Sequence, residues 1–293
     1  MKILTFDIGG TAIKYGICND DFELTEKHSV PTEAKLGGQH IIEKVIEIIE
    51  SFSDIDRVAI STAGQVDSQN GIVVYSTDNI PYYTGMMVKS IVENKTGIPC
   101  FVENDVNSAA VGEAKFGAAI GCSDFICLTY GTGIGGAIFL DGKLYKGSGN
   151  SAGELGHMIT HAGGKQCTCG GDGCYECYAS AKALLTSIKR NTGEDLNGFQ
   201  IFEKKNFEKP EIRSEIDKWI DEIISGLINI IYIFNPPLIV LGGGILNEDY
   251  IIELIDRKIY NKLMDNYKKV NIVRAKLGND AGMLGAAYLA SLI

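Results

Sequence analysis

The residues best placed to do chemistry form a turn after the first strand-like segment, with the sequence Asp7-Ile8-Gly9-Gly10-Thr11. Glycines let backbone N–H groups approach an anion closely, and the threonine hydroxyl adds a hydrogen bond, so the turn suits a phosphate. Asp7 is then a candidate Mg²⁺ ligand, because magnesium at phosphates uses only one or two protein carboxylates. The alternative is a tight hairpin in which Asp7 and Thr11 satisfy only the backbone of the turn.

Two other glycine turns also follow strand-like segments: Gly131-Thr132-Gly133-Ile134-Gly135-Gly136 and Gly242-Gly243-Gly244. The first has neither the register of a dinucleotide-binding turn nor the lysine of a Walker loop. The second could let a nucleotide base or ribose lie on bare backbone. Any one of the three turns fits an ordinary loop, but the set predicts a nucleotide-binding protein.

A polar group, Glu103-Asn104-Asp105, ends another strand-like segment just before a helical pattern over 106–116. Asn and Asp often cap helices, so these residues by themselves predict the start of a helix.

Four of the eight cysteines fall between Cys167 and Cys177. Disulfides would not persist in a reducing compartment, so this crowding indicates a metal. Clustered thiols and permissive glycines can wrap a tetrahedral ion, which favours zinc. By spacing alone, the ligands are either all four cysteines or three of them together with His157.

Strand-like and helical patterns alternate along the chain and predict an α/β fold. The expected strands are 3–6, 15–18, 57–61, 99–103, 125–130, 137–140 and 238–241, and the expected helices are 39–52, 106–116, 212–234 and about 280–292. The strand, glycine turn and strand of 3–18 recur at 125–140, which indicates two related lobes that each contribute a phosphate-handling turn.

The composition, with 45% hydrophobic and 22% charged residues, is typical of a globular protein. The net charge of −10 makes a nucleic acid an unexpected partner. Asp7 interrupts the first apolar stretch, and Pro236 and Pro237 interrupt the longest one, 227–241. We therefore expect a cytoplasmic protein with neither an export signal nor a membrane span.

Taken together and in order, five motifs resemble those of the ROK family of bacterial sugar kinases and related repressors. They are D-x-G-G-T, E-N-D, G-T-G-x-G-G, G-E-x-G-H and C-x-C-G-x-x-G-C-x-E, and the resemblance spans nearly the whole chain. It implies the two-lobed, actin-like ATPase (ribonuclease H-like) fold, with an active site in the interlobe cleft and a zinc-binding loop. We expect a small lobe over 1–106, onto which helix 280–293 packs, and a large lobe over 107–279 with the zinc loop at 157–177.

The same resemblance implies a role for each motif. Asp105 would be the general base that accepts the proton of the attacking sugar hydroxyl, and Asn104 would hold a neighbouring hydroxyl. The residues implied for ATP and Mg²⁺ are Asp7, Gly9, Gly10, Thr11, Lys14, Gly131, Thr132, Gly133, Gly243 and Gly244. The ligands implied for a structural Zn²⁺ are His157, Cys167, Cys169 and Cys174, and Glu154, His157 and Glu176 would bind the sugar.

The segment 60–77 resembles the N-acetylmannosamine kinases of the family more than the glucokinases, which generally have G-P-G at its turn. Gly64, Gln65 and Thr77 would then lie near the acetamido group, although an arginine often stands where Gln65 does. Residues 79–81, Asn-Ile-Pro, instead resemble the N-L-P of glucokinases. We predict phosphorylation of the 6-hydroxyl of a hexose or N-acylhexosamine, with N-acetylmannosamine ahead of glucose; fructose, N-acetylglucosamine and β-glucosides are further alternatives.

The non-enzyme alternative is a sugar-sensing ROK regulator. Repressors of the family bind DNA through an added amino-terminal helix-turn-helix, whereas this chain begins at the strand before its first glycine turn and is acidic. Asp7, Thr11 and Asp105 are the residues that catalysis would need, so we expect a kinase. The resemblance further implies a homodimer.

Overall fold

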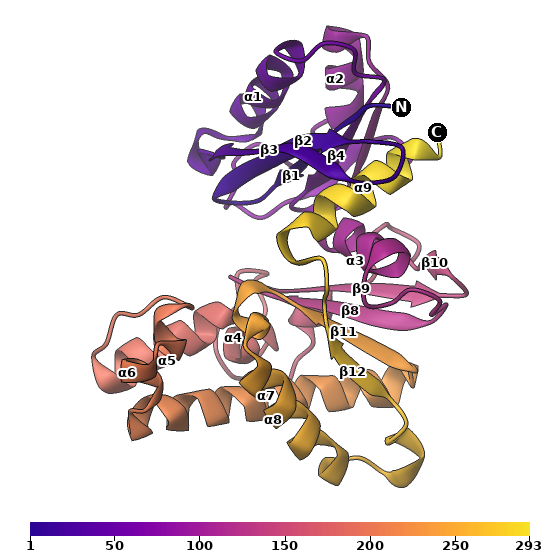
Figure 1. The fold of residues 1–293 in the computed structure, drawn as a ribbon. Coiled ribbons are helices and arrows are strands. Elements are labelled where there is room, and N and C mark those ends of the chain that lie inside the picture. Colours follow the sequence, from indigo (N-terminus) through magenta and orange to yellow (C-terminus); the bar gives the residue numbers. More distant parts are fainter. The chain divides into compact units, whose positions relative to one another are not determined.

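The computed structural model describes the backbone of residues 1–293 and the side chains of all of them except 247 and 249. The chain divides into two compact units. Unit 1 comprises Met1–Gly121, Lys146–Ala152 and Asn279–Ile293, and unit 2 comprises Cys122–Tyr145 and Gly153–Gly278. Each unit contains one five-stranded sheet (Figure 1).

The sheet of unit 1 has the strand order β3 (Leu24–Pro31), β2 (Ala12–Cys18), β1 (Ile3–Ile8), β4 (Arg57–Thr62) and β7 (Cys100–Asn104). β1 pairs antiparallel with β2 and parallel with β4, and β4 pairs parallel with β7. Ile8, Thr62 and Asn104 lie in register across the three parallel strands. Residues that follow these strands therefore meet at one edge of the sheet, where α/β proteins commonly bind ligands.

Helices cover both faces of this sheet (Figure 1). On one face, α1 (Gly38–Glu50) buries Ile41, Ile42, Val45 and Ile49 at helical spacing, and α2 (Val88–Thr96) lies beside it. The short hairpin of β5 (Gln65–Asp67) and β6 (Ile72–Tyr75) forms a separate two-stranded sheet.

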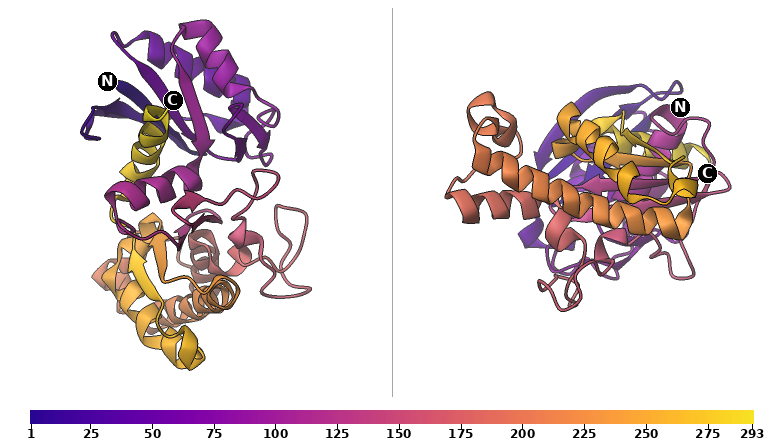
Figure 2. Two further views of the ribbon diagram at one scale, coloured as in Figure 1. Left: turned by 90° about the vertical axis from the view of Figure 1, so that its right-hand side faces the viewer. Right: turned by 90° about the horizontal axis from the view of Figure 1, so that it is seen from below.

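The other face carries α3 (Asp105–Phe116) and α9 (Ala281–Ser291), which lie against each other in Figures 1 and 2. A Cβ atom added at Gly285 would overlap the carbonyl oxygen of Ser108, so the two helix backbones are in direct contact. This packing places the whole of α3 in unit 1, whereas the boundary predicted after residue 106 assigned 107–116 to the large lobe.

The sheet of unit 2 has the strand order β10 (Lys143–Leu144), β9 (Ile134–Leu140), β8 (Phe125–Tyr130), β11 (Leu238–Gly242) and β12 (Asn271–Arg274). β8 pairs antiparallel with β9 and parallel with β11, and β11 pairs parallel with β12. These are the directions found in unit 1, so the repeat inferred from the glycine turns is a repeat of sheet topology.

The helices of unit 2 are α4 (Glu176–Ala179), α5 (Ala181–Thr192), α6 (Lys204–Phe207), α7 (Pro210–Phe234) and α8 (Asp249–Ile259). α7 starts with a proline, which is favourable at a first helical position, and is followed by Asn235, a C-terminal cap in the left-handed conformation. Its buried Trp219 donates a hydrogen bond to the carbonyl of Ala179 at 2.8 Å, which joins α7 to α4. Among the helices that the structure describes, none has both the length and the apolar character needed to span a membrane.

Candidate functional site

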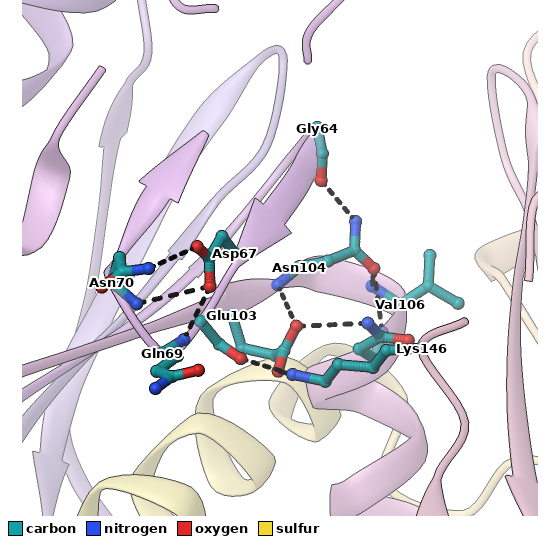
Figure 3. A network of polar contacts seen from close by, with 10 residues as sticks. Gly64, Asp67, Gln69, Asn70, Glu103, Asn104, Val106 and Lys146 are labelled. Atoms are coloured by element: carbon teal, nitrogen blue, oxygen red, sulfur yellow. Dashed lines mark hydrogen bonds and ion pairs between the residues drawn. The ribbon is translucent and has the colours of Figure 1, made fainter. Parts of the chain in front are cut away.

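Asp105 is the first residue of α3, at the carboxyl end of β7. Asn104 caps the helix, because its Oδ1 accepts hydrogen bonds from the N–H groups of Val106 and Asn107, both at 3.0 Å. Its Nδ2 donates to the Gly64 carbonyl at 2.8 Å (Figure 3) and to Asp105 Oδ1 at 2.9 Å. The cap predicted from the sequence is therefore present, and it also connects Asp105 to Gly64.

The carboxyl group of Asp105 has an unusual acidity. Burial raises its pKa to about 7, and the negative charge of Asp7 adds to the rise; hydrogen bonds from the Val106 N–H and Asn104 oppose it. A general base works best when its pKa lies near the operating pH, because it must be ionised and still attract a proton. Perturbed groups of this kind are concentrated at functional sites.

Asp7 lies at the end of β1, within the same unit. Ser61 Oγ donates a hydrogen bond to its Oδ1 at 3.0 Å, and Lys14 Nζ lies 3.9 Å from its Oδ2. Burial raises the pKa of Asp7, whereas Lys14 and Ser61 lower it. The backbone of Gly282 in α9 also faces this carboxylate, since an added Cβ would lie 3.1 Å from Oδ1.

The turn after Asp7 is open. Gly9 N donates to the carbonyl of Ala12 at 3.1 Å, which closes a tight hairpin. Gly10 and Thr11 are exposed at its tip, and a Cβ added at Gly10 would have no other atom within 4 Å. The turn therefore has room for an anion beside the Asp7 carboxylate.

The remaining predicted sugar ligands of unit 1 lie on the β5–β6 hairpin and the loop after it. Gln65 Oε1 accepts a hydrogen bond from Ser151 Oγ at 2.8 Å. Thr77 follows β6, and its carbonyl accepts from Ile80 N at 3.2 Å. In the described part of the chain, no hydrogen bond joins the Thr77 side chain to Asn104 or Asp105, and the sugar-binding role of Thr77 stays a prediction.

In unit 2, the second and third glycine turns lie side by side. A Cβ at Gly243 would overlap the carbonyl oxygen of Tyr130, the residue before Gly131, and the φ of Gly243 is 112°. Only glycine fits such a position without strain. Gly131, Thr132 and Gly244 are exposed beside this contact, so the ends of β8 and β11 form one surface of accessible backbone.

The predicted zinc ligands converge in the same unit. Ligand atoms of His157, Cys167, Cys169 and Cys174 all lie within 4.8 Å of one another. Two separations are 3.6 Å, between the Sγ atoms of Cys169 and Cys174 and between Cys167 Sγ and His157 Nδ1. Two thiolates that each lie about 2.3 Å from a tetrahedral zinc ion would be about 3.8 Å apart, so the cluster fits this metal.

The structure thus favours one of the two ligand sets that the spacing allowed. Cys177 Sγ lies outside the cluster and lies 3.7 Å from the carbonyl oxygen of Gln166. A hydrogen bond from the Gly171 N–H lowers the pKa of the Cys169 thiol, which favours the thiolate that a metal needs, whereas burial raises the pKa of Cys167.

Two carboxylates flank His157, which lies in the short 3₁₀ turn Leu155–His157. Its Nε2 lies 3.9 Å from Glu154 Oε2, and its Nδ1 lies 3.9 Å from Glu176 Oε1. Glu176 Oε2 also accepts a hydrogen bond from Ile134 N at 3.2 Å. A Cβ at Gly133 would overlap this carboxylate, so the second glycine turn lies directly against Glu176.

The sequence analysis missed Ser61, Lys146 and Gly282. Lys146 forms an ion pair with Glu103, the residue before Asn104 (Figure 3). Nothing local marks these residues, because each reaches an acidic group that lies at least 43 positions away in the sequence.

Comparison with known proteins identifies the family to which the chain belongs. The ROK family model matches residues 3–292. Glucokinase of Streptomyces coelicolor is 33% identical, with 97% of this chain and 96% of that protein covered. The structure of a ROK family glucokinase from Streptomyces griseus, solved with glucose and AMPPNP, matches with a TM-score of 0.90, 29% identity and full coverage of both chains.

A Listeria monocytogenes structure, solved as that of a candidate N-acetylmannosamine kinase, matches with a TM-score of 0.89 and 30% identity. The match covers 100% of this chain and 99% of that one. The order of motifs, the repeated sheet and these similarities agree, and the chain therefore belongs to the ROK family and has its actin-like ATPase fold.

Proposed function

We propose that the protein transfers the γ-phosphate of ATP to the 6-hydroxyl of a hexose or N-acylhexosamine. The observation that carries this proposal is the position of Asp105 at the carboxyl end of β7 in a chain of the ROK family, where Asn104 Nδ2 donates to its Oδ1 at 2.9 Å and its pKa is raised to about 7. The named relatives, which include glucokinases, support the same reaction class.

In the proposed reaction, the sugar oxygen forms a bond to the γ-phosphorus while the bond from that phosphorus to the β–γ bridging oxygen breaks. Asp105 Oδ1 already accepts hydrogen bonds from Val106 N and Asn104 Nδ2, so Oδ2 is the oxygen that takes the hydroxyl proton. ADP leaves with the electron pair of the broken bond. Phosphoryl transfer has a loose transition state, so positioning and neutralisation of charge supply most of the acceleration.

The other residues bind and orient the reactants. Asp7 would hold Mg²⁺, which neutralises phosphate charge when bound, and the Gly9-Gly10-Thr11 turn would hold a phosphate. The exposed backbone around Gly131 and Gly243 would hold the nucleotide. Lys14 Nζ donates to Asn279 Oδ1 at 3.0 Å and lies near Asp7, where it can offset the charge of the phosphates.

Unit 2 would contribute sugar ligands through its metal centre. Zn²⁺ would be bound by His157, Cys167, Cys169 and Cys174, and with four protein ligands it would be structural. Because His157 Nδ1 faces Cys167, its Nε2 remains for a sugar hydroxyl, next to Glu154. A metal-bound imidazole has a fixed tautomer and orientation, so the zinc would orient the Nε2 atom of His157 toward the sugar hydroxyl.

We propose N-acetylmannosamine as the first substrate, with glucose as the alternative. The Gly64-Gln65 turn and the similar Listeria structure support the amino sugar. The named glucokinases and residues 79–81 support glucose. A cytoplasmic location and a homodimer remain predictions, and sedimentation velocity would test the latter.

The test is release of ADP from MgATP with a panel of sugars: N-acetylmannosamine, glucose, N-acetylglucosamine, fructose and cellobiose. We expect the highest kcat/KM for N-acetylmannosamine, and ³¹P–¹H correlation of the product should place the phosphate on O6. A higher kcat/KM for glucose would overturn the choice of sugar. If the protein phosphorylates none of the sugars in the panel, the proposed function is overturned.

A further inference from the structure

Glu103, the residue before the Asn104-Asp105 pair, has a buried carboxylate. Its side chain is 1% exposed, and it forms an ion pair with Lys146 Nζ. A buried carboxylate without a counter-ion is strongly unfavourable, so Lys146 is a structural requirement of this position. The pair is absent from the catalytic scheme above, in which neither residue touches a reactant.

The carboxylate of Glu103 accepts hydrogen bonds from residues at the start of α3 (Figure 3). One oxygen, Oε2, meets Lys146, and the other, Oε1, accepts hydrogen bonds from Asn104 N at 2.9 Å and from Asn107 Nδ2 at 3.1 Å. Asn104 in turn donates to Asp105 Oδ1 at 2.9 Å. A continuous set of polar contacts therefore leads from Lys146 to the carboxyl group of the proposed base.

Lys146 arrives on a short loop from a distant part of the chain. The segment Lys146–Ala152 belongs to unit 1, although the residues before and after it belong to unit 2. Ala152 N donates to the Lys146 carbonyl at 3.1 Å, which closes the loop on itself. Lys146 Nζ also donates to Ser68 Oγ, and Ser151 Oγ donates to Gln65 Oε1 at 2.8 Å, so side chains anchor both ends of the loop to unit 1.

The anchored loop also precedes two predicted sugar ligands. Gly153 follows Ala152 directly, and Glu154 and His157 come next in the chain. One end of the loop thus contacts Glu103, which supports the base, and the other end leads into residues that the proposed function assigns to sugar binding.

We propose that Lys146 and Glu103 are positioning residues that hold the first turn of α3, and with it the Asp105 carboxyl group, in the orientation for proton transfer. This inference rests on the proposed function. According to this inference, the ion pair affects the rate of the chemical step as well as the stability of the fold. The effect on rate passes through Asn104, which contacts both Glu103 and Asp105. A base displaced by about 1 Å can cost a factor of about 100 in rate, so the effect should be measurable.

The test compares three variants with the wild-type protein in the sugar assay. Lys146→Met removes the charge and keeps much of the side-chain volume, Lys146→Arg keeps the charge, and Lys146→Met with Glu103→Gln removes both charges. Glutamine retains an Oε1 acceptor for Asn104 N and Asn107. The matched control is Lys218→Met, which breaks the 2.7 Å ion pair with Glu215, a carboxylate whose side chain is 6% exposed, in α7.

We expect Lys146→Met to lower kcat about 10- to 100-fold while the KM values for sugar and MgATP stay within about threefold of the wild type. Lys146→Arg should recover most of kcat, and Lys218→Met should keep it within about twofold. The double variant should lose less than Lys146→Met, because no unpaired carboxylate remains.

The inference would be overturned if Lys146→Met kept kcat within about twofold while folded, or if Lys218→Met lost as much kcat for the same fall in melting temperature. If Lys146→Met fails to fold, the double variant decides: an unchanged kcat at a wild-type melting temperature sinks the inference. If the wild-type protein phosphorylates no sugar, the proposed function itself is overturned. If the wild-type protein is active and the variants have the same kcat, only the positioning role of Lys146 and Glu103 is overturned.

Discussion

The two units share one sheet topology but carry different chemistry at equivalent places. Each sheet has an antiparallel meander followed by two parallel strands, and β1 and β8 each run for six residues into a glycine turn. The second-to-last residue is Asp7 in β1 and Thr129 in β8. In unit 1 the repeat places an acid before the turn, whereas unit 2 has a neutral residue there.

The insertions between strands also differ. Between β3 and β4, unit 1 has the amphipathic helix α1, whereas between β10 and β11, unit 2 has the cluster of His157 with three cysteines and helices α4 to α7. Unit 1 therefore carries two carboxyl groups with raised pKa, Asp7 and Asp105, and unit 2 carries exposed backbone and a cluster of histidine and cysteine side chains that could hold a metal. The comparison teaches that one topology supplies equivalent strand ends, and that the residues placed there give the two repeats different chemical groups.

The largest effect should come from the acid of unit 1. Asp105→Asn keeps the shape and an Oδ1 acceptor but removes the base, so we expect kcat to fall about 10²- to 10⁴-fold with sugar affinity unchanged. Calorimetric titration of sugar and the ADP assay measure the two quantities. Asp124→Asn, at a half-buried acid before β8, is the control and should keep full activity. An Asp105→Asn protein with wild-type kcat would remove the assigned difference between the units.

The same substitution has an effect on stability whose sign follows from the pKa. Because the folded state raises the pKa of Asp105 to about 7, the ionised carboxylate costs stability above that pH, and the cost vanishes as pH falls toward 4. Asp105→Asn should therefore melt higher than wild type at pH 8 and equal to it near pH 4. Equal melting temperatures at pH 8 would contradict the raised pKa.

The next effect concerns the metal scaffold of unit 2. Cys174→Ser should lower zinc affinity about 10- to 100-fold or more and raise the sugar KM, because a ligand of the cluster is lost. Cys177→Ser is a matched control, since Cys177 lies outside the cluster. Competition with a chromogenic chelator measures zinc release. Equal loss of zinc from both variants would mean that the four cysteines, without His157, form the site.

A smaller effect, a fall of about fivefold in kcat/KM, is expected in the wild-type protein between pH 7 and 6. The protonated form of Asp105 cannot accept a proton, so kcat/KM should fall as pH decreases through the raised pKa of about 7. The profile of kcat/KM reports the free enzyme, which is the state that the structure describes. A profile that is flat down to pH 5.5 would contradict Asp105 as the base.

The smallest expected effect tests the paired glycine turns of unit 2. Gly243→Ala puts a Cβ against the Tyr130 carbonyl at a φ of 112°, so we expect a loss of about 1–3 kcal/mol in the free energy of unfolding and a raised KM for ATP. Gly244→Ala is the control, because its Cβ would meet no other atom within 4 Å, and it should change stability by less than about 0.5 kcal/mol. Equal effects in denaturant unfolding would show that the close contact does not constrain Gly243.

Much of the fold could be predicted because the signals are local. The strand predicted over 125–130 is β8 with the same bounds, and the helix predicted over 39–52 is α1 (Gly38–Glu50). Side-chain periodicity depends only on near neighbours, so it can be read from the sequence. The position of α3 could not, because it depends on the contact between Gly285 and Ser108, which are far apart in the chain.

The sequence by itself determined seven of the strands, the three glycine turns, the cap before α3 and the crowding of thiols that indicates zinc, since each is a property of a few adjacent residues, whereas β3, β5, β6, β10 and β12 were not predicted. Only the tertiary structure showed that the cluster includes His157 and not Cys177. It also raised the pKa of Asp105 and brought Lys146 into contact with Glu103. These outcomes depend on burial and on charges from remote segments, and both are set by the path of the folded chain.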